Sequence, residues 1–190
     1  MAIKFLAPAA FTGLVLALTG ATPAAAQASG PDAGLTADSI FIQTAGSIGL
    51  LQAKLGAIAQ KKATSPAVRD FGKRMVEEYT KANQQLATGA KQAAYPAPLM
   101  LRQHKQVLDR FLGMGGGSFD KNYMAEVVKQ QGEAAQLFKE EAEGGRVASL
   151  KQLASNMLPS VQQQLALATQ TASTVGADVT VSTSQGRKSS

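Results

Sequence analysis

The sequence predicts an all-α fold: an antiparallel, mainly four-helix bundle with one short extra helix and a proline-kinked last helix. Three observations lead to this prediction. Apolar residues recur at helical spacing in five stretches, helix-breaking residues separate those stretches, and no run alternates apolar and polar residues as a strand would. Short connections between helices favour antiparallel neighbours.

The first two helices are predicted over residues 36–62 and from 65 to about 94. Thr36 or Asp38 is a suitable cap for the first helix. Ser65 followed by Pro66 indicates the second start, because serine accepts a free amide and proline tolerates the first turn. The inner faces follow helical spacing: Ile40, Thr44, Ile48, Leu51, Leu55 and Ile58, then Val68, Phe71, Met75, Tyr79, Ala82 and Leu86.

A short third helix is predicted over residues 99–112, before a glycine-rich connection at 113–117. Ser118 is the expected cap of a fourth helix, and Asp120 is expected to interact with the dipole of that helix. Gly144 and Gly145 end it. The inner face of this fourth helix is Phe119, Tyr123, Val127, Gln131, Ala134 and Phe138.

The last helix is predicted from about residue 146 to about 174. Pro159 lies inside it and removes one backbone hydrogen bond, so a kink or break near Leu158 is expected. The inner face is Leu150, Leu153, Met157, Val161, Gln164 and Ala168.

Residues 1–26 are predicted to be a cleaved signal peptide. Lys4 precedes an interrupted apolar run over residues 5–18, and small residues at 24–26 suit a signal peptidase. A flexible linker at 27–35, a bundle domain at 36–175 and a disordered tail at 176–190 follow from composition. We therefore expect an exported protein of the periplasm or cell envelope, soluble after signal cleavage. The absence of cysteine excludes disulfides and thiolate chemistry.

The charge distribution argues against nucleic-acid binding. The chain has 19 basic and 13 acidic residues, but the bases are scattered and are not interleaved with aromatic residues. A solvated surface accounts for them. The alternative interpretation is weak contact between these bases and anionic membrane surfaces. We also expect a partner, either a protein or another envelope component, but the sequence does not indicate which.

Four blocks carry a resemblance to a known family. They are residues 49–56 (GLLQAKLG) with 65–71 (SPAVRDF), 74–83 (RMVEEYTKAN), 119–123 (FDKNY), and Leu158-Pro159 before the final helix. Together they resemble the exported, ferritin-like family of unknown function often labelled "predicted outer membrane protein" in bacteria. The resemblance implies a ferritin-like bundle over roughly residues 38–173.

The same resemblance implies where a metal site would lie. Family members typically carry an acid on the first helix, a histidine after an acid on the second, and one histidine on each of the last two. The matching positions here are Gln52, Tyr79 after Glu78, Gln131 and Gln164. Every expected histidine is replaced, and only Glu78 is a good ligand for a hard metal ion.

We therefore predict a mid-bundle polar layer of Gln52, Glu78, Tyr79, Gln131 and Gln164, with no catalytic, cofactor or metal site. Leaving a buried amide unpaired costs about 1–3 kcal/mol, so these side chains should pair with one another. The only histidine, His104, has polar neighbours and is expected to be exposed. Seven glutamates are mostly spaced as outward charges: Glu77, Glu78, Glu126, Glu133, Glu140, Glu141 and Glu143.

The functional expectation is a non-catalytic exported helical-bundle protein of the bacterial cell envelope, with a structural or interaction role and no enzyme activity. The alternative is a metal-binding ferritin-like protein or oxidoreductase with a degenerate site.

Overall fold

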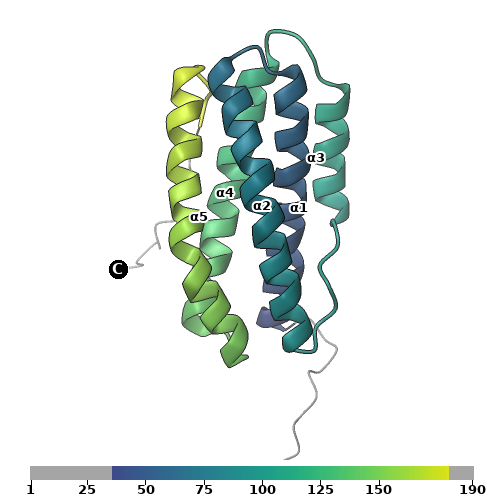
Figure 1. Cartoon of the computed structure of the whole chain (residues 1–190), viewed down its shortest axis with the longest axis vertical. Helices are drawn as coiled ribbons and strands as arrows, with labels where there is room; N and C mark the ends of the chain where they lie inside the picture. The colour runs from purple at the N-terminus through teal and green to yellow at the C-terminus, as the bar shows by residue number, and fades with distance from the viewer. Residues whose placement is uncertain (1–35, 180–190) are drawn as a thin grey trace, which may run out of the picture. The chain divides into compact units, whose positions relative to one another are not determined.

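The computed structural model describes residues 36–179, which contain five α-helices and no strand (Figure 1). This confirms the predicted fold class. The expected signal peptide, the linker up to residue 35 and residues 180–190 lie outside the described residues. The helices are α1 (Ala37–Lys62), α2 (Pro66–Gln92), α3 (Arg102–Gly113), α4 (Phe119–Gly144) and α5 (Ala148–Thr174).

Two antiparallel hairpins build the bundle: α1 packs on α2, and α4 packs on α5. The hairpins meet through α1 against α4 and through α2 against α5. The connection from α2 to α4 carries the chain back along the bundle through α3, so α4 starts at the same end as α2 (Figure 1). One long crossover of this kind is the connectivity of ferritin-like bundles.

The two hairpins have matching helix boundaries. Ala37 and Phe119 begin α1 and α4, and Pro66 and Ala148 begin α2 and α5; the members of each pair are 82 residues apart, and the helix ends keep the same spacing. The bundle therefore consists of two units of equal length. The α1–α4 side carries α3, and no helix among the described residues packs over the opposite, α2–α5 side.

An aspartate in the first turn of each hairpin holds the loop of the other hairpin. Asp38 of α1 accepts hydrogen bonds from the backbone N–H groups of Arg146 (2.9 Å) and Val147 (3.0 Å). Asp120 of α4 accepts from the N–H groups of Thr64 (3.1 Å) and Ser65 (2.7 Å). Asp120 therefore contributes more than the expected interaction with its own helix dipole.

Only one of the predicted serine and threonine caps makes its side-chain bond. The Thr36 hydroxyl accepts a hydrogen bond from the N–H of Ser39, which confirms Thr36 as the cap of α1. Ser65 occupies the cap position of α2 without such a bond, and its backbone N–H donates to Asp120 instead of to a group of its own hairpin. Ser118 likewise makes no side-chain cap bond.

Apolar side chains form two buried clusters along the bundle. The cluster nearer the α1–α2 loop contains a group of aromatic rings, in which Phe119 stacks on Tyr123 and Phe111 meets both edge-on. Phe41 and Phe138 form an edge-to-face pair in the other cluster. Each such ring contributes about 1.5–3 kcal/mol by leaving water. After α5 ends, Ala177 and Val179 still pack against the first cluster.

The helix α3 is anchored by a histidine, so the prediction that His104 is exposed is wrong. His104 is 1% exposed, and its Nδ1 forms a hydrogen bond of 2.6 Å with the hydroxyl of Ser47 on α1. The same hydroxyl oxygen accepts a hydrogen bond of 2.7 Å from the N–H of Leu101. Polar sequence neighbours hid this role, although His104 and the buried Phe111 are two helical turns apart.

Glu141 is a second exception to the expected pattern, because this glutamate is 3% exposed. It lies against Asp38, and burial together with the neighbouring Asp38 carboxylate raises the pKa of Glu141 to about 7. Burial alone would raise the pKa of Asp38 as well, but hydrogen bonds from Val147, Arg146 and Glu141 hold it below its ordinary value. The outward-facing interpretation of this glutamate was wrong.

The helix α5 continues through Pro159 and is not broken. Figure 1 shows that α5 changes direction part-way along its length, as a lost backbone hydrogen bond and a ring clash within a helix would cause. Among residues 36–179, no helix is both long and apolar enough to cross a membrane.

Candidate functional site

A hydrogen bond across the bundle centre joins two of the predicted layer residues. The Tyr79 hydroxyl on α2 donates to Oε1 of Gln131 on α4 over 2.8 Å, and both side chains are buried. Gln131 uses its amide nitrogen to donate to the Met75 sulfur at 3.5 Å. Burial raises the pKa of Tyr79 well above its ordinary value, so the phenol stays protonated and serves as a donor.

A second hydrogen bond joins Gln164 of α5 to Glu78 of α2. The amide nitrogen of Gln164 donates to Oε2 of Glu78 over 2.8 Å. Gln164 is 9% exposed, and its Oε1 is buried without a hydrogen-bond partner among the described residues. The end of this side chain therefore keeps one unused acceptor beside a carboxylate.

Gln52 is buried on α1 but joins neither pair. Its side chain is 0% exposed, and neither its oxygen nor its nitrogen finds a hydrogen-bond partner within residues 36–179. The expectation that all the buried amides pair with one another is therefore wrong for Gln52. The resemblance assigned this residue to the bundle centre but could not show whether a partner would reach it.

Tyr123 is a buried polar residue that the sequence interpretation treated as part of the apolar stripe. It is 0% exposed, its ring belongs to the aromatic cluster, and its hydroxyl has no partner among the described residues. Burial raises the pKa of Tyr123 far above its usual value, so the hydroxyl stays neutral. Helical spacing predicted that Tyr123 faces inward, but it could not predict that the hydroxyl would lack a partner.

The residues at the bundle centre do not fit the metal site that the resemblance implies. A di-iron bundle site needs inward carboxylates and histidines from all four helices. Here one carboxylate, Glu78, lies beside neutral amides and a protonated phenol. Across the described part of the chain, no three histidine, aspartate or glutamate residues gather closely enough to hold a metal ion.

A groove of about 1290 Å³ runs between α2 and α5 beside this layer. Tyr79, Glu78 and Gln164 belong to its lining. Further in, its floor is apolar and includes side chains from all four bundle helices: Ile48, Leu86, Ala134, Phe138, Leu153, Met157 and Val161. Its rim is rich in uncharged amides: Asn83, Gln84, Gln85, Gln92, Gln152, Asn156, Gln163 and Gln170.

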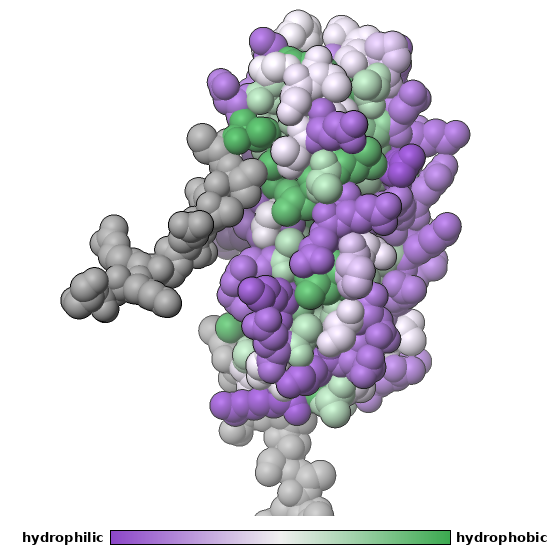
Figure 2. All heavy atoms as spheres, turned by 90° about the vertical axis from the view of Figure 1, so that its left-hand side faces the viewer, coloured by the Kyte–Doolittle hydropathy of each residue, from purple (hydrophilic) through white to green (hydrophobic). Residues whose placement is uncertain are grey.

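The surface view agrees with a partly apolar face on this side of the bundle. Figure 2 faces α5 and shows hydrophobic residues in a broken lengthwise band between hydrophilic side chains. The groove was not predictable from the sequence, because α2 and α5 are distant in sequence and their spacing depends on tertiary packing. The only sequence signals for this face are the runs of amides on α2 and α5, which line the rim of the groove.

These features define a class: an all-α bundle domain with ferritin-like connectivity and a centre of neutral polar side chains. The chain belongs to the family described as "Domain of unknown function (DUF4142)", whose model matches residues 20–171. The match confirms the predicted membership in a family of unknown function. No curated protein and no solved structure matches the chain significantly.

Proposed function

We propose that this chain is a non-catalytic, exported helical-bundle protein of the bacterial cell envelope that acts by binding a partner or ligand. The resemblance to an exported family and the signal-like first 26 residues support the address. The observation that carries the proposal is the Tyr79–Gln131 hydrogen bond, which occupies the bundle centre with neutral groups.

Neutral groups at this place favour binding over metal chemistry. Di-iron and di-manganese sites in helical bundles take their ligands from carboxylates and histidines, whereas an amide brings no negative charge to a divalent ion. The Gln131 oxygen already accepts from Tyr79, and the Gln164 nitrogen already donates to Glu78. A metal ion bound here would break those hydrogen bonds, and Glu78 would be its only carboxylate ligand.

The Ser47–His104 pair also supports a non-catalytic role. A serine hydroxyl 2.6 Å from a histidine has the geometry of a nucleophile and its base. However, Ser47 is 0% and His104 1% exposed, and neither residue lines the groove between α2 and α5. A substrate would have to displace α3 to reach the hydroxyl, so the pair is better explained as the anchor of α3.

Anaerobic calorimetric titration with Fe(II) and Mn(II) tests the proposal. The native protein should show no saturable binding. A variant with Gln52→Glu, Tyr79→His, Gln131→His and Gln164→His carries the residue types that the resemblance assigns and should gain a saturable site. Saturable, near-stoichiometric binding by the native protein would reject the proposal in favour of the alternative, a metal-binding protein or oxidoreductase.

A further inference from the structure

We propose that the groove between α2 and α5 binds a lipid with a zwitterionic aminophosphate head group, one lipid per chain. The head would lie beside Arg74, Glu78 and Lys81, and the acyl chain would lie along the apolar floor. This inference rests on the proposed binding function and names the chemistry of its ligand.

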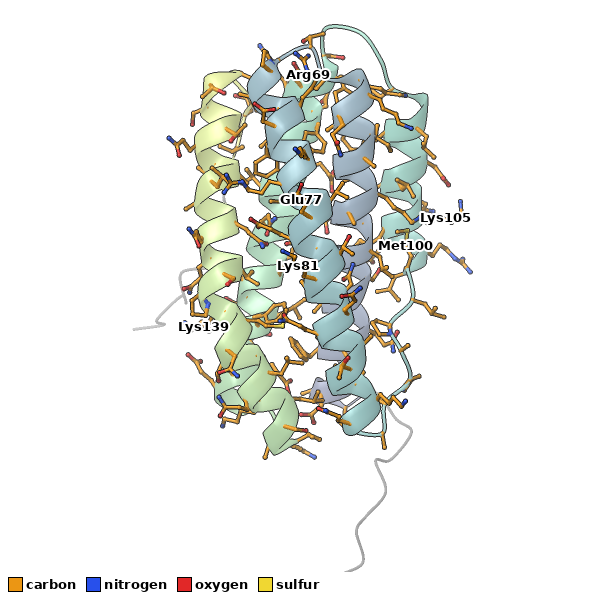
Figure 3. All side chains as sticks on the ribbon, viewed as in Figure 1. Arg69, Glu77, Lys81, Met100, Lys105 and Lys139 are labelled. Carbon is orange, nitrogen blue, oxygen red and sulfur yellow. The ribbon has the colours of Figure 1, made fainter. Side chains whose placement is uncertain are left out.

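All three charged residues of the groove lining lie on one helix, in the half of the lining that begins at Arg74. Arg74, Glu78 and Lys81 follow each other at spacings of four and three, so they share one face of α2. The α5 side of the lining is uncharged. Figure 3 labels Lys81 and the neighbouring Glu77 one turn apart on α2. The groove therefore has a charged end and a long uncharged remainder, which suits an amphiphile.

The charged end of the groove carries two positive side chains and one negative side chain, which match the phosphate and the ammonium group of a zwitterionic head. Arg74 and Lys81 are exposed cations, and phosphate is a common partner of both residue types. The ion pairs within residues 36–179 are Lys105–Asp109, Arg110–Glu126 and Lys129–Glu133, so Glu78 takes part in none.

An ammonium group would satisfy the acceptors at this end. Glu78 is half-buried and already accepts one hydrogen bond from Gln164, whose Oε1 is buried and unpaired. A primary ammonium donates up to three hydrogen bonds and carries the charge that a carboxylate attracts. Glu78 and Gln164 Oε1 together offer what such a group needs, whereas a purely anionic head would leave both acceptors unused.

The dimensions of the groove suit an acyl chain below the head. On α2 the uncharged part of the lining follows Lys81 and runs to Gln92, which corresponds to about 16 Å at 1.5 Å per residue. One leaflet of a bilayer has a hydrocarbon thickness of about 15 Å, half of the full core. The volume of about 1290 Å³ is larger than the roughly 300–1,000 Å³ of pockets for drug-sized ligands.

Lysolipids with one acyl chain length and different head groups test the inference. We would titrate the full chain, stripped of lipid, with phosphoethanolamine, phosphoglycerol and free-carboxylate forms below their micelle concentrations. Calorimetry and native mass spectrometry should show one phosphoethanolamine lipid per chain, bound about tenfold more tightly than the other two, because charge-assisted hydrogen bonds distinguish the head groups.

Adjacent residues provide matched controls. Glu78→Gln and Arg74→Gln should each weaken binding of the phosphoethanolamine form about tenfold. Glu77→Gln and Lys73→Gln change the same charges outside the groove lining and should leave affinity unchanged. Leu153→Gln, on the apolar floor, should weaken all three lysolipids together.

Three results would overturn the inference: no binding of any lysolipid, equal affinity for all head groups, or equal effects of the groove variants and their neighbours. The last result would indicate a diffuse charge effect at the surface. A saturable site for an amphipathic peptide that lysolipid does not displace would also contradict it. None of these results touches the metal titration, so failure of this inference and failure of the proposed function remain distinguishable.

Discussion

The hydroxyl of Tyr79 and the amide oxygen of Gln131 lie 2.8 Å apart at the centre of the bundle. Their helices, α2 and α4, are not among the closely packed pairs, so the bond crosses the bundle diagonally. Buried polar bonds of this kind fix the relative position of helices even where they add little net stability. This one occupies the level at which the resemblance implies metal ligands.

The first prediction separates paired from unpaired tyrosines. Tyr79→Phe should lower the free energy of unfolding by about 1–3 kcal/mol, because the Gln131 oxygen is left buried without its donor. Tyr123→Phe removes a hydroxyl that has no partner and should be neutral or stabilising. Urea unfolding followed by circular dichroism measures both. An equal decrease in the free energy of unfolding in the two variants would show that the hydrogen bond between Tyr79 and Gln131 adds no stability of its own.

The second prediction concerns Gln52. Gln52→Leu should raise the free energy of unfolding by about 1–3 kcal/mol, because a buried amide without partners is replaced by an apolar side chain of similar size. Gln131→Leu is the matched comparison and should destabilise, since it leaves the Tyr79 hydroxyl unpaired. The melting temperatures of the two variants should therefore move in opposite directions from that of the native protein.

The third prediction is a pH dependence caused by Glu141. Its pKa is about 7 in the folded protein against 4.5 ordinarily, so between these values the folded state binds more protons than the unfolded state. This group's contribution to stability is complete below about pH 4.5 and is lost as pH rises to about 7. Glu141→Gln should remove that loss while keeping a hydrogen-bonding group beside Asp38.

The check for Glu141 is the difference in unfolding free energy between native protein and variant, measured from pH 4.5 to 7.5. The unfolding free energy of the native protein minus that of the variant should fall steadily as pH rises and level off above about pH 7. The charged groups facing Glu141 are Asp38 and Lys151, and the variant leaves both in place. A flat difference would show that Glu141 titrates normally in the folded protein.

The fourth prediction has the opposite sign and concerns His104. Burial lowers its pKa, Glu126 partly offsets this, and Lys129 adds to it, so the folded state holds the ring neutral. As pH falls through about 6.5 the unfolded or undocked ring takes up a proton, and the contribution of His104 to the docking of α3 is lost. Acid should therefore loosen α3 on α1.

Hydrogen exchange of residues 102–113 measures that loosening. After correction for intrinsic rates, these amides should exchange faster at pH 5 than at pH 7, while the amides of α4 and α5 change less. His104→Asn keeps a small polar group near Ser47 but cannot titrate, so the pH difference should disappear. Persistence of the difference in the variant would assign the effect to another group.

Local patterns were enough to predict the helices. Ser65–Pro66 predicted the start of α2, and the glycines within 113–117 and at 144–145 predicted the two ends of α4, because these residues act on the backbone nearby. The inward positions of Tyr79, Gln131 and Gln164 were also predictable from helical spacing, whereas Gln52 was assigned to the centre only by the resemblance.

Features that depend on contacts between distant segments were not predictable. His104 is buried because the crossover returns it to Ser47, 57 residues away, and Glu141 is buried because Asp38 packs on the α4–α5 loop. The pairing of the buried amides depends on the exact distances between helices. The prediction that Gln52 would find a partner was therefore wrong. The groove between α2 and α5 exists only once the two hairpins have met.

The most direct test of the central claim, a bundle centre of neutral side chains that does not hold a metal, is elemental analysis. The protein would be purified from the cell envelope fraction of its native host without added metal or chelator. The structure predicts iron and manganese far below one equivalent per chain. Near-stoichiometric iron or manganese that is lost in the Glu78→Gln variant would contradict it.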